Sequence, residues 1–211
     1  MQTLLRASAA AVGLFALGLQ FWLEALLPHN LGLLGSALNF FSYFTIVANV
    51  AAALAMVMPL VAPNEGAGRF FLRPSVRTAI TGYMIVVAGT YFLFLRDIGN
   101  DRGLERFADE LMHYVTPVLF LIDWLVFVPK GMVPLTAIAT TLYTPILYGL
   151  WTIVHGALTN WYPYPFFSFS KLGHQQALMN MAIDLGAFLA VELFLVVTDR
   201  TIARVQRHRS G

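Results

Sequence analysis

Six long apolar stretches constrain this chain more than any other feature of its sequence. They cover about residues 4–27, 38–61, 76–96, 111–128, 132–155 and 177–198. A helix of about 18 or more apolar residues can cross a membrane, because it satisfies its own backbone polar groups. The composition agrees, since 58% of the residues are hydrophobic and 11% are charged, against about 25% charged in soluble domains. We therefore predict an all-α membrane protein in which residues 1–211 form a single domain, a bundle of six transmembrane helices.

Several other interpretations are excluded by particular residues. The first apolar stretch is too long for a signal peptide, lacks a small-x-small cleavage site and carries Glu24 near its end, so we expect a retained helix. Cysteine is absent, which excludes disulfides, a thiolate nucleophile and cysteine-bound zinc or iron–sulfur centres. The basic residues gather at the ends of the predicted helices, where membrane orientation uses them, so they do not indicate nucleic-acid binding.

Lysine and arginine are distributed unevenly between the two ends of the predicted helices. With the N-terminus in the cytoplasm, nine of them fall on the cytoplasmic side: Arg6, Arg69, Arg73, Arg77, Lys130, Arg200, Arg204, Arg207 and Arg209. Four fall on the outer side: Arg96, Arg102, Arg106 and Lys171. Because cytoplasmic segments carry an excess of Lys and Arg, we predict that both termini are cytoplasmic.

In this orientation, most polar side chains of the predicted helices fall in the outer half of the membrane. Thr45 lies seven residues, or about 10 Å, below the outer end of the second helix, and His113 lies in the first turn of the fourth. The others in this half are Glu24, His155, Asn180 and Asp184, while His29 and His174 lie in outer loops. Polar groups within a membrane usually face the interior of a bundle or a water-filled cavity. We therefore predict a polar cavity that opens to the outer face.

The predicted loop between the fifth and sixth helices, TNWYPYPFFSFSKLG, combines prolines with many aromatic residues. Trp and Tyr prefer the membrane interface. We expect this loop to lie on the outer membrane surface, where it can cap the cavity.

Each candidate residue also has a purely structural interpretation. A threonine in a membrane helix usually bonds the carbonyl four residues earlier or a neighbouring helix, and Asn49 shares the face of Thr45. Asp123 lies ten residues, or about 15 Å, below His113, and Glu192 is also deep. Carboxylates inside a membrane are candidate functional groups, but Asp123 and its neighbour Trp124 equally suit a tie between helices. Spacing alone leaves these alternatives open.

Two motifs resemble a known family. FSYFTIVAN on the second predicted helix, MHYVTPVLFLIDW on the fourth and the YP-containing loop before the last resemble the androgen-induced-gene and androgen-dependent-TFPI-regulating protein superfamily, in particular its bacterial six-helix branch. The resemblance covers most of the chain in helix count and order. Eukaryotic members are threonine hydrolases of fatty acid esters of hydroxy fatty acids. The resemblance implies that Thr45 is a nucleophile with His113 as its partner, in a lipid-ester hydrolase of a bacterial cell membrane.

The chemistry that this resemblance implies needs a base, an orienting group and oxyanion donors. A threonine hydroxyl becomes a nucleophile when a base takes its proton, and His113 suits that role. Asp184, Glu24 or a backbone carbonyl are candidate acceptors for its other ring nitrogen. Asn49, Asn180, His155 and Tyr114 are candidate oxyanion donors. We expect no metal or cofactor, and the partners expected are the lipid ester and the surrounding membrane lipids.

Three rival interpretations belong to other classes. A metal-dependent hydrolase would use His113, His155 and Asp184 as ligands, although no HxxxH or HExxH pair is present. A haem-binding electron carrier would need two histidines facing each other at similar depth, as His113 and His155 barely could. A non-enzymatic transporter or lipid-binding protein would be expected to show broken-helix repeats, which the sequence lacks.

Overall fold

The computed structural model describes residues 1–27, 31–98 and 102–210, and this part of the chain is helical and contains no strand. The α-helices are α1 (Gln2–Phe21), α2 (Gly32–Phe41), α3 (Phe44–Val61), α4 (Gly66–Leu72), α5 (Pro74–Thr90), α6 (Leu104–Glu110), α7 (Thr116–Phe127), α8 (Thr136–Thr159) and α9 (Phe169–Ser210). Three π-helical turns, η1 (Trp22–Leu26), η2 (Tyr91–Leu95) and η3 (Leu111–Val115), continue these helices, and η4 (Pro165–Phe167) is a short 3-10 turn.

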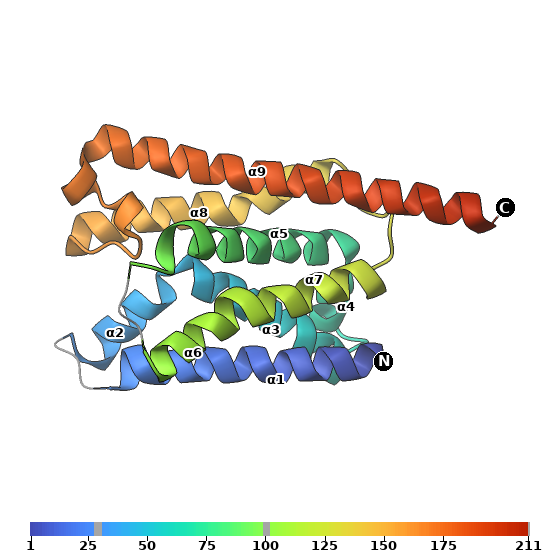
Figure 1. Ribbon diagram of the computed structural model, residues 1–211, viewed down its shortest axis with the longest axis horizontal. Coiled ribbons are helices and arrows are strands. Elements are labelled where there is room, and N and C mark those ends of the chain that lie inside the picture. Colours follow the sequence, from blue (N-terminus) through green and yellow to red (C-terminus); the bar gives the residue numbers. More distant parts are fainter. Residues whose placement is uncertain (28–30, 99–101, 211) are drawn as a thin grey trace.

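Six spans in the described residues are long and apolar enough to cross a membrane, which confirms the predicted fold class. They are Gln2–Leu26, Phe44–Val61, Pro74–Leu95, Leu104–Phe127, Thr136–Thr159 and Phe169–His208. The spans run along the long axis of the molecule, and both ends of the chain lie at the same end of the bundle (Figure 1). This arrangement agrees with termini on one side of the membrane, and the assignment of that side to the cytoplasm stays a prediction.

The prediction of the second helix, 38–61, was wrong at its outer end. The helix is interrupted at Ser42 and Tyr43, where Tyr43 adopts an extended backbone conformation (φ −84°, ψ 131°), so that α2 and α3 are separate helices. The tyrosine ring packs edge-on against Trp161 and Tyr164, with ring centroids 5.6 and 5.7 Å apart. Thr45 therefore lies in the first turn of α3 and not seven residues inside a helix.

The prediction of the fourth helix, 111–128, was also wrong at its outer end, because the observed membrane span begins at Leu104. Charged residues occupy its first turns, and Arg106 pairs with Glu110 one turn later at 2.9 Å, an arrangement that supports an exposed helix. Consequently His113 is the tenth residue of this span and not part of its first turn.

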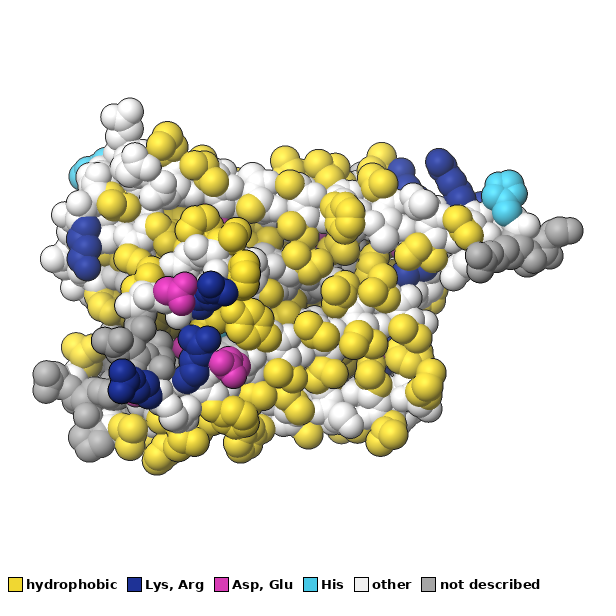
Figure 2. Space-filling view, in the orientation of Figure 1, with side chains coloured by type: hydrophobic (Ala, Val, Ile, Leu, Met, Phe, Trp, Pro, Cys, Tyr) yellow, Lys and Arg dark blue, Asp and Glu magenta, His cyan; other side chains and the backbone are white. Residues whose placement is uncertain are grey.

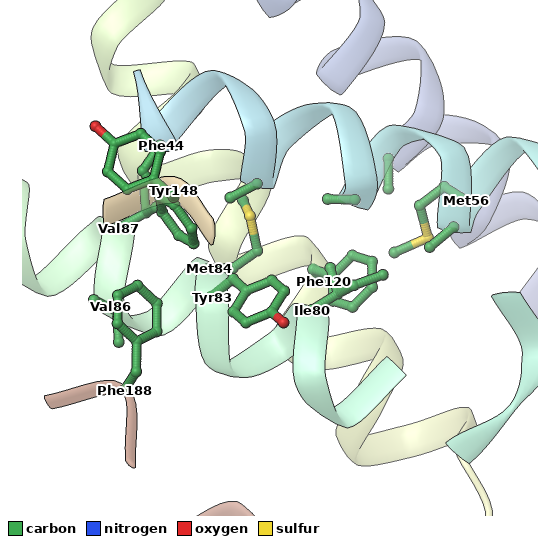
Figure 3. Close-up of a cluster of buried hydrophobic side chains, with 14 of the residues drawn as sticks. Phe44, Met56, Ile80, Tyr83, Met84, Val86, Val87, Phe120, Tyr148 and Phe188 are labelled. Carbon is green, nitrogen blue, oxygen red and sulfur yellow. The ribbon is translucent and has the colours of Figure 1, made fainter. Parts of the chain in front are cut away.

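The main core surrounds α5, which packs against α3, α7, α8 and α9. Three aromatic rings from different helices meet there: Phe44 lies 5.7 Å from Tyr83 and 4.9 Å from Phe188, in edge-on arrangements (Figure 3). Such pairs add about 0.5–1.5 kcal/mol each beyond the burial of their area. Because Phe44 precedes Thr45 directly, this core holds the start of α3 in place.

The outer surface of the bundle is largely apolar. Figure 2 shows hydrophobic side chains along the flank and charged side chains gathered toward the ends of the long axis. Large side chains such as Phe15, Leu147 and Phe194 are more than half exposed. An exposed apolar band of this kind matches the hydrocarbon of a membrane.

Asp123 joins three helices through buried ion pairs. Its Oδ1 lies 2.8 Å from Arg6 Nε on α1, and its Oδ2 lies 2.9 Å from an Nη of Arg77 on α5. All three side chains are at most 7% exposed. We call Arg6, Asp123 and Arg77 the charged brace. Beside it, Trp124 Nε1 donates to Thr78 Oγ1 at 2.8 Å, so Asp123 and Trp124 tie α7 to its neighbours.

Candidate active site

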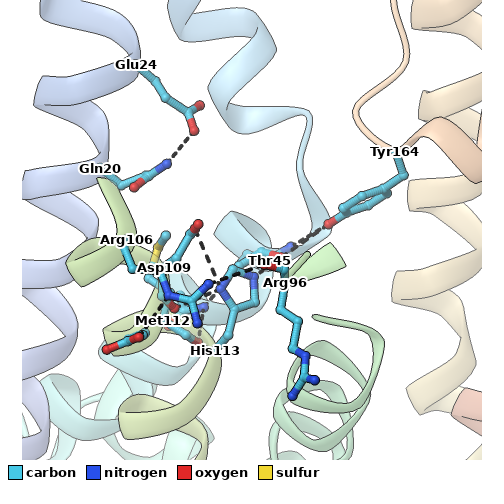
Figure 4. Close-up of polar contacts among 11 residues, drawn as sticks. Gln20, Glu24, Thr45, Arg96, Arg106, Asp109, Met112, His113 and Tyr164 are labelled. Carbon is cyan, nitrogen blue, oxygen red and sulfur yellow. Dashed lines mark hydrogen bonds and ion pairs between the residues drawn. The ribbon is translucent and has the colours of Figure 1, made fainter. Parts of the chain in front are cut away.

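Thr45 and His113 face each other between α3 and η3. Thr45 Oγ1 lies 3.3 Å from His113 Nε2, and both residues are buried in the protein but border a cavity (Figure 4). The histidine sits in a π-helical turn, a local widening that is frequent at functional sites. A hydroxyl and an imidazole at this distance form the pair that nucleophilic catalysis requires.

The ring of His113 is held by two contacts. Its Nδ1 lies 2.9 Å from the carbonyl oxygen of Asp109, one turn earlier. A carbonyl only accepts, so Nδ1 carries the proton and Nε2 of the neutral ring is the acceptor that faces Thr45. Tyr91 stacks on the imidazole with a centroid distance of 4.0 Å and an interplanar angle of 14°. The imidazole is therefore oriented with its basic nitrogen on the hydroxyl of Thr45.

The carboxylate of Asp109 lies beside the same ring. Its Oδ1 lies 3.8 Å from His113 Nδ1, and both side chains are largely buried. The backbone of Asp109 thus orients the histidine, and its side chain lies close to the same ring nitrogen.

Tyr164, from the loop before α9, contacts Thr45 on its other side. Its hydroxyl lies 3.2 Å from Thr45 Oγ1 and accepts from the backbone N–H of Thr45 at 3.2 Å. Burial raises the pKa of Tyr164 to about 12, so its hydroxyl remains a donor at neutral pH. Thr45 is the second residue of α3, where backbone N–H groups have no partner within the helix and the helix dipole is positive. The Tyr164 hydroxyl, fixed by the N–H of Thr45, is therefore placed to donate to Oγ1 while Thr45 donates to His113.

Asn49 fixes the relative position of the two helices that carry the pair. Its Nδ2 donates to the carbonyl of Thr45 at 2.9 Å and to the carbonyl of Met112 at 3.3 Å. Asn49 is fully buried. Asn49 therefore holds the backbone at Thr45 and beside His113, and it is not among the residues that line the cavity.

A cavity of about 710 Å³ lies in front of the pair. Its apolar lining includes Leu23, Ile46, Leu95 and Met112, and its polar lining includes Gln20, Glu24, Ser36, Asn39, Glu105 and Asp109. The loop before α9 contributes Trp161, Pro163, Tyr164 and Pro165 to the wall. A cavity of several hundred Å³ with apolar walls and a few convergent polar groups is typical of a small-molecule site.

The remaining predicted site residues lie around the cavity and not in it. His155 Nε2 is 3.2 Å from the Oδ1 of Asn39, which lines the cavity. Asn180 Nδ2 donates to the carbonyl of Phe166 at 2.8 Å and so fastens the loop that carries Tyr164. Tyr114 packs edge-on against Tyr91 at 5.5 Å.

Asp184 and the deep residues Asp123 and Trp124 lie outside the cavity of about 710 Å³ at Thr45 and His113. Asp184 borders a small cavity of about 20 Å³ that also touches Thr45. Asp123 and Trp124 belong to the charged brace and its surroundings and line none of the cavity at Thr45.

Of the three acceptors considered for His113, a backbone carbonyl is the one that the structure places on Nδ1. Glu24 instead accepts from Gln20 on its own helix.

Within the described parts of the chain, no group of three His, Asp or Glu side chains gathers as a metal site would require, so His113, His155 and Asp184 form no ligand set. His29 falls outside the described residues.

Sequence reasoning missed Asp109 and Tyr164. Asp109 falls just before the predicted fourth helix, 111–128, although its spacing four residues before His113 places both on one face of the observed span. Tyr164 lies in the aromatic loop that was expected to cap the cavity, but nothing in the sequence singles it out from the neighbouring aromatic residues.

No protein-family model matches this chain, and neither a curated protein nor a solved structure matches it. The function must therefore be argued from the geometry of the site.

Proposed function

We propose that this protein is an intramembrane threonine hydrolase that cleaves lipid esters, with Thr45 as nucleophile and His113 as general base. The observation that supports this most is the chain of contacts from Thr45 Oγ1 to His113 Nε2 at 3.3 Å and from His113 Nδ1 to the Asp109 carbonyl at 2.9 Å. Nucleophile, base and orienting group are in the order that acyl transfer uses. The resemblance of the FSYFTIVAN and MHYVTPVLFLIDW motifs to a family of threonine hydrolases points to the same two residues.

The reaction proceeds in two halves. His113 Nε2 takes the proton of the Thr45 hydroxyl while Oγ1 attacks the ester carbonyl carbon, which gives a tetrahedral oxyanion. The C–O bond of the ester then breaks, the leaving alkoxide takes the proton from Nε2, and an acyl-threonine remains. In the second half a water molecule loses its proton to Nε2 and attacks the acyl group, which releases the carboxylic acid and regenerates Thr45.

The oxyanion is stabilised by the Tyr164 hydroxyl beside Oγ1. This hydroxyl accepts from the N–H of Thr45 and lies 3.2 Å from Oγ1, and α3 adds the positive end of its dipole. During the same step the carboxylate of Asp109, 3.8 Å from Nδ1, stabilises the imidazolium that forms.

A lipid ester is the substrate class that suits this cavity. The catalytic pair lies between membrane-spanning helices, and the cavity wall combines apolar side chains with carboxyl, amide and hydroxyl groups. The acyl chain packs against residues such as Leu95 and Ile46, while the polar part of the ester faces the carboxyl and amide groups. Membrane lipids supply such molecules directly to the bundle.

The decisive experiment is covalent labelling combined with ester hydrolysis. Protein in nanodiscs is treated with a fluorophosphonate and assayed with p-nitrophenyl esters and fatty acid esters of hydroxy fatty acids. Thr45→Ala and His113→Ala are each expected to lose nearly the whole catalytic effect, because nucleophile and base act as a unit. Thr45→Ser keeps the hydroxyl and is expected to retain labelling.

Two matched controls separate catalysis from folding. Thr140→Ala removes a helix threonine whose Oγ1 donates to the carbonyl of Ala137, and His174→Ala removes an exposed histidine at the start of α9. Both controls are expected to keep activity and labelling. Full ester hydrolysis by Thr45→Ala would overturn the mechanism.

A further inference from the structure

A second large cavity lies at the end of the bundle where the chain termini are found. Its volume is about 540 Å³, and it is lined by Gly131, Met132, Val133, Pro134, Arg200, Ala203, Arg204 and Arg207. It is formed between the loop after α7 and the last turns of α9. Figure 2 shows separate dark-blue side chains at this end of the molecule, as at the opposite end. We call this space the arginine cavity.

The three arginines project from one face of α9. Residues 200, 204 and 207 are spaced by four and three, which places them on one side of a helix. The opposing wall is held against them, because the N–H of Gly131 donates to Asp199 Oδ2 at 2.9 Å. A Cβ added at Gly131, which has φ 78°, would lie 2.8 Å from Ala203 Cβ and 3.5 Å from an Nη of Arg207. The loop and the helix therefore form a fixed cleft.

The charge of the arginine cavity is positive. No acidic side chain is among the described residues that line it. The carboxylate of Asp199, next to Arg200 in the chain, is fully buried, accepts from the N–H of Gly131 and interacts with Lys130. Asp199 thus contacts residues of the loop, while the three arginines line the cavity.

The remaining wall is apolar and continues onto the lipid-facing surface. Met132, Leu135 and Val205 are exposed by 65%, 57% and 48%, and the first of these lines the arginine cavity itself. A ligand that fits both parts carries an anionic group next to hydrocarbon chains. Guanidinium groups match phosphate oxygens in geometry as well as charge, because each can donate two parallel hydrogen bonds.

We propose that the arginine cavity binds the phosphate of an anionic phospholipid, with Arg200 and Arg204 as its principal donors. The acyl chains lie along the apolar surface beside Met132 and Leu135. This site is separate from Thr45 and does not depend on the hydrolase proposal.

The test measures lipid binding to purified protein in a neutral detergent. Short-chain phosphatidylglycerol, the matching phosphatidylcholine and inorganic phosphate are titrated, and bound lipid is detected by native mass spectrometry with thermal stability as a second readout. Phosphatidylglycerol is expected to bind and raise the unfolding temperature, while the other two have little effect. Equal binding of phosphatidylcholine overturns the proposal, and an equal effect of inorganic phosphate overturns the assignment to a lipid.

Two pairs of variants remove the same amount of charge. Arg200→Gln/Arg204→Gln is expected to weaken phosphatidylglycerol binding about tenfold or more, because two charge-assisted hydrogen bonds are lost. The control Arg69→Gln/Arg73→Gln removes two exposed arginines near the same end of the bundle and is expected to bind as the native protein does. Arg200→Lys/Arg204→Lys keeps the charge and should fall between them. If Arg200→Gln/Arg204→Gln and Arg69→Gln/Arg73→Gln weaken phosphatidylglycerol binding to a similar extent, only net charge matters and the proposal is wrong.

Discussion

Asp123→Asn should destabilise the bundle more than any other single substitution in the charged brace. The carboxylate is fully buried and is 2.8 and 2.9 Å from two guanidinium groups that are at most 7% exposed. Asparagine keeps the size of the side chain but leaves both Arg6 and Arg77 charged without a counter-ion. Breaking a buried pair in this way costs about 3–5 kcal/mol, because the remaining charge stays desolvated.

The two arginines should behave differently from Asp123 and from each other. Arg6→Gln leaves Asp123 and Arg77 as a balanced pair and is expected to have the smallest effect. Arg77→Gln should be worse, because Arg77 also donates to the carbonyl of Ala55 at 3.1 Å. Asp123→Asn/Arg6→Gln removes one charge of each sign, so its loss should be smaller than the sum of the two single losses.

The assay is equilibrium unfolding in mixed micelles by added denaturing detergent, followed by circular dichroism. The reasoning predicts the order Asp123→Asn, then Arg77→Gln, then Arg6→Gln for the loss in free energy of unfolding. An Asp123→Asn variant as stable as the native protein would refute it, as would strict additivity in the double variant.

Three further outcomes are expected. Tyr164→Phe should lower kcat roughly 10²–10³-fold, as loss of one oxyanion donor does, while fluorophosphonate labelling of Thr45 persists; an unchanged kcat would remove Tyr164 from the mechanism. Gly82→Ala should lose about 1–3 kcal/mol of stability, because the added Cβ would overlap Glu192 Oε1, and combining it with Glu192→Ala should recover part of that loss in thermal unfolding. A reporter fused after Gly211 should be active only in a cytoplasm-specific form, and activity of a periplasm-specific fusion would reverse the predicted orientation.

The number of membrane spans could be predicted from the sequence because hydropathy over some twenty residues is a strong signal. Their outer ends could not. The break at Tyr43 lies within a continuous apolar run and depends on ring contacts with Trp161 and Tyr164, which are more than one hundred residues away. The early start of the fourth span at Leu104 was hidden because its first turns are charged.

The candidate site could be predicted only in part, because some of its residues are marked by their chemical type and others only by tertiary contacts. Thr45 and His113 stood out as a hydroxyl and an imidazole at similar predicted depth, and the structure places them 3.3 Å apart. Tyr164 depends on how the loop before α9 folds, which local sequence does not determine. Arg6 and Arg77 were counted as cytoplasmic anchors, yet both are buried against Asp123, because ion pairs between distant residues leave no periodic signal.

The charged brace also has a consequence for the order in which the protein is made. Arg6 is synthesised 117 residues before Asp123. At about 5–20 residues per second, roughly 6–23 s pass before the counter-ion leaves the ribosome. During that interval the arginine of α1 must keep its charge at the lipid headgroups, where long basic side chains can reach water. We therefore expect the first helix to reach its final depth only after α7 has entered the membrane, and a chain that ends between Arg77 and Asp123 holds both arginines without the carboxylate that pairs with them.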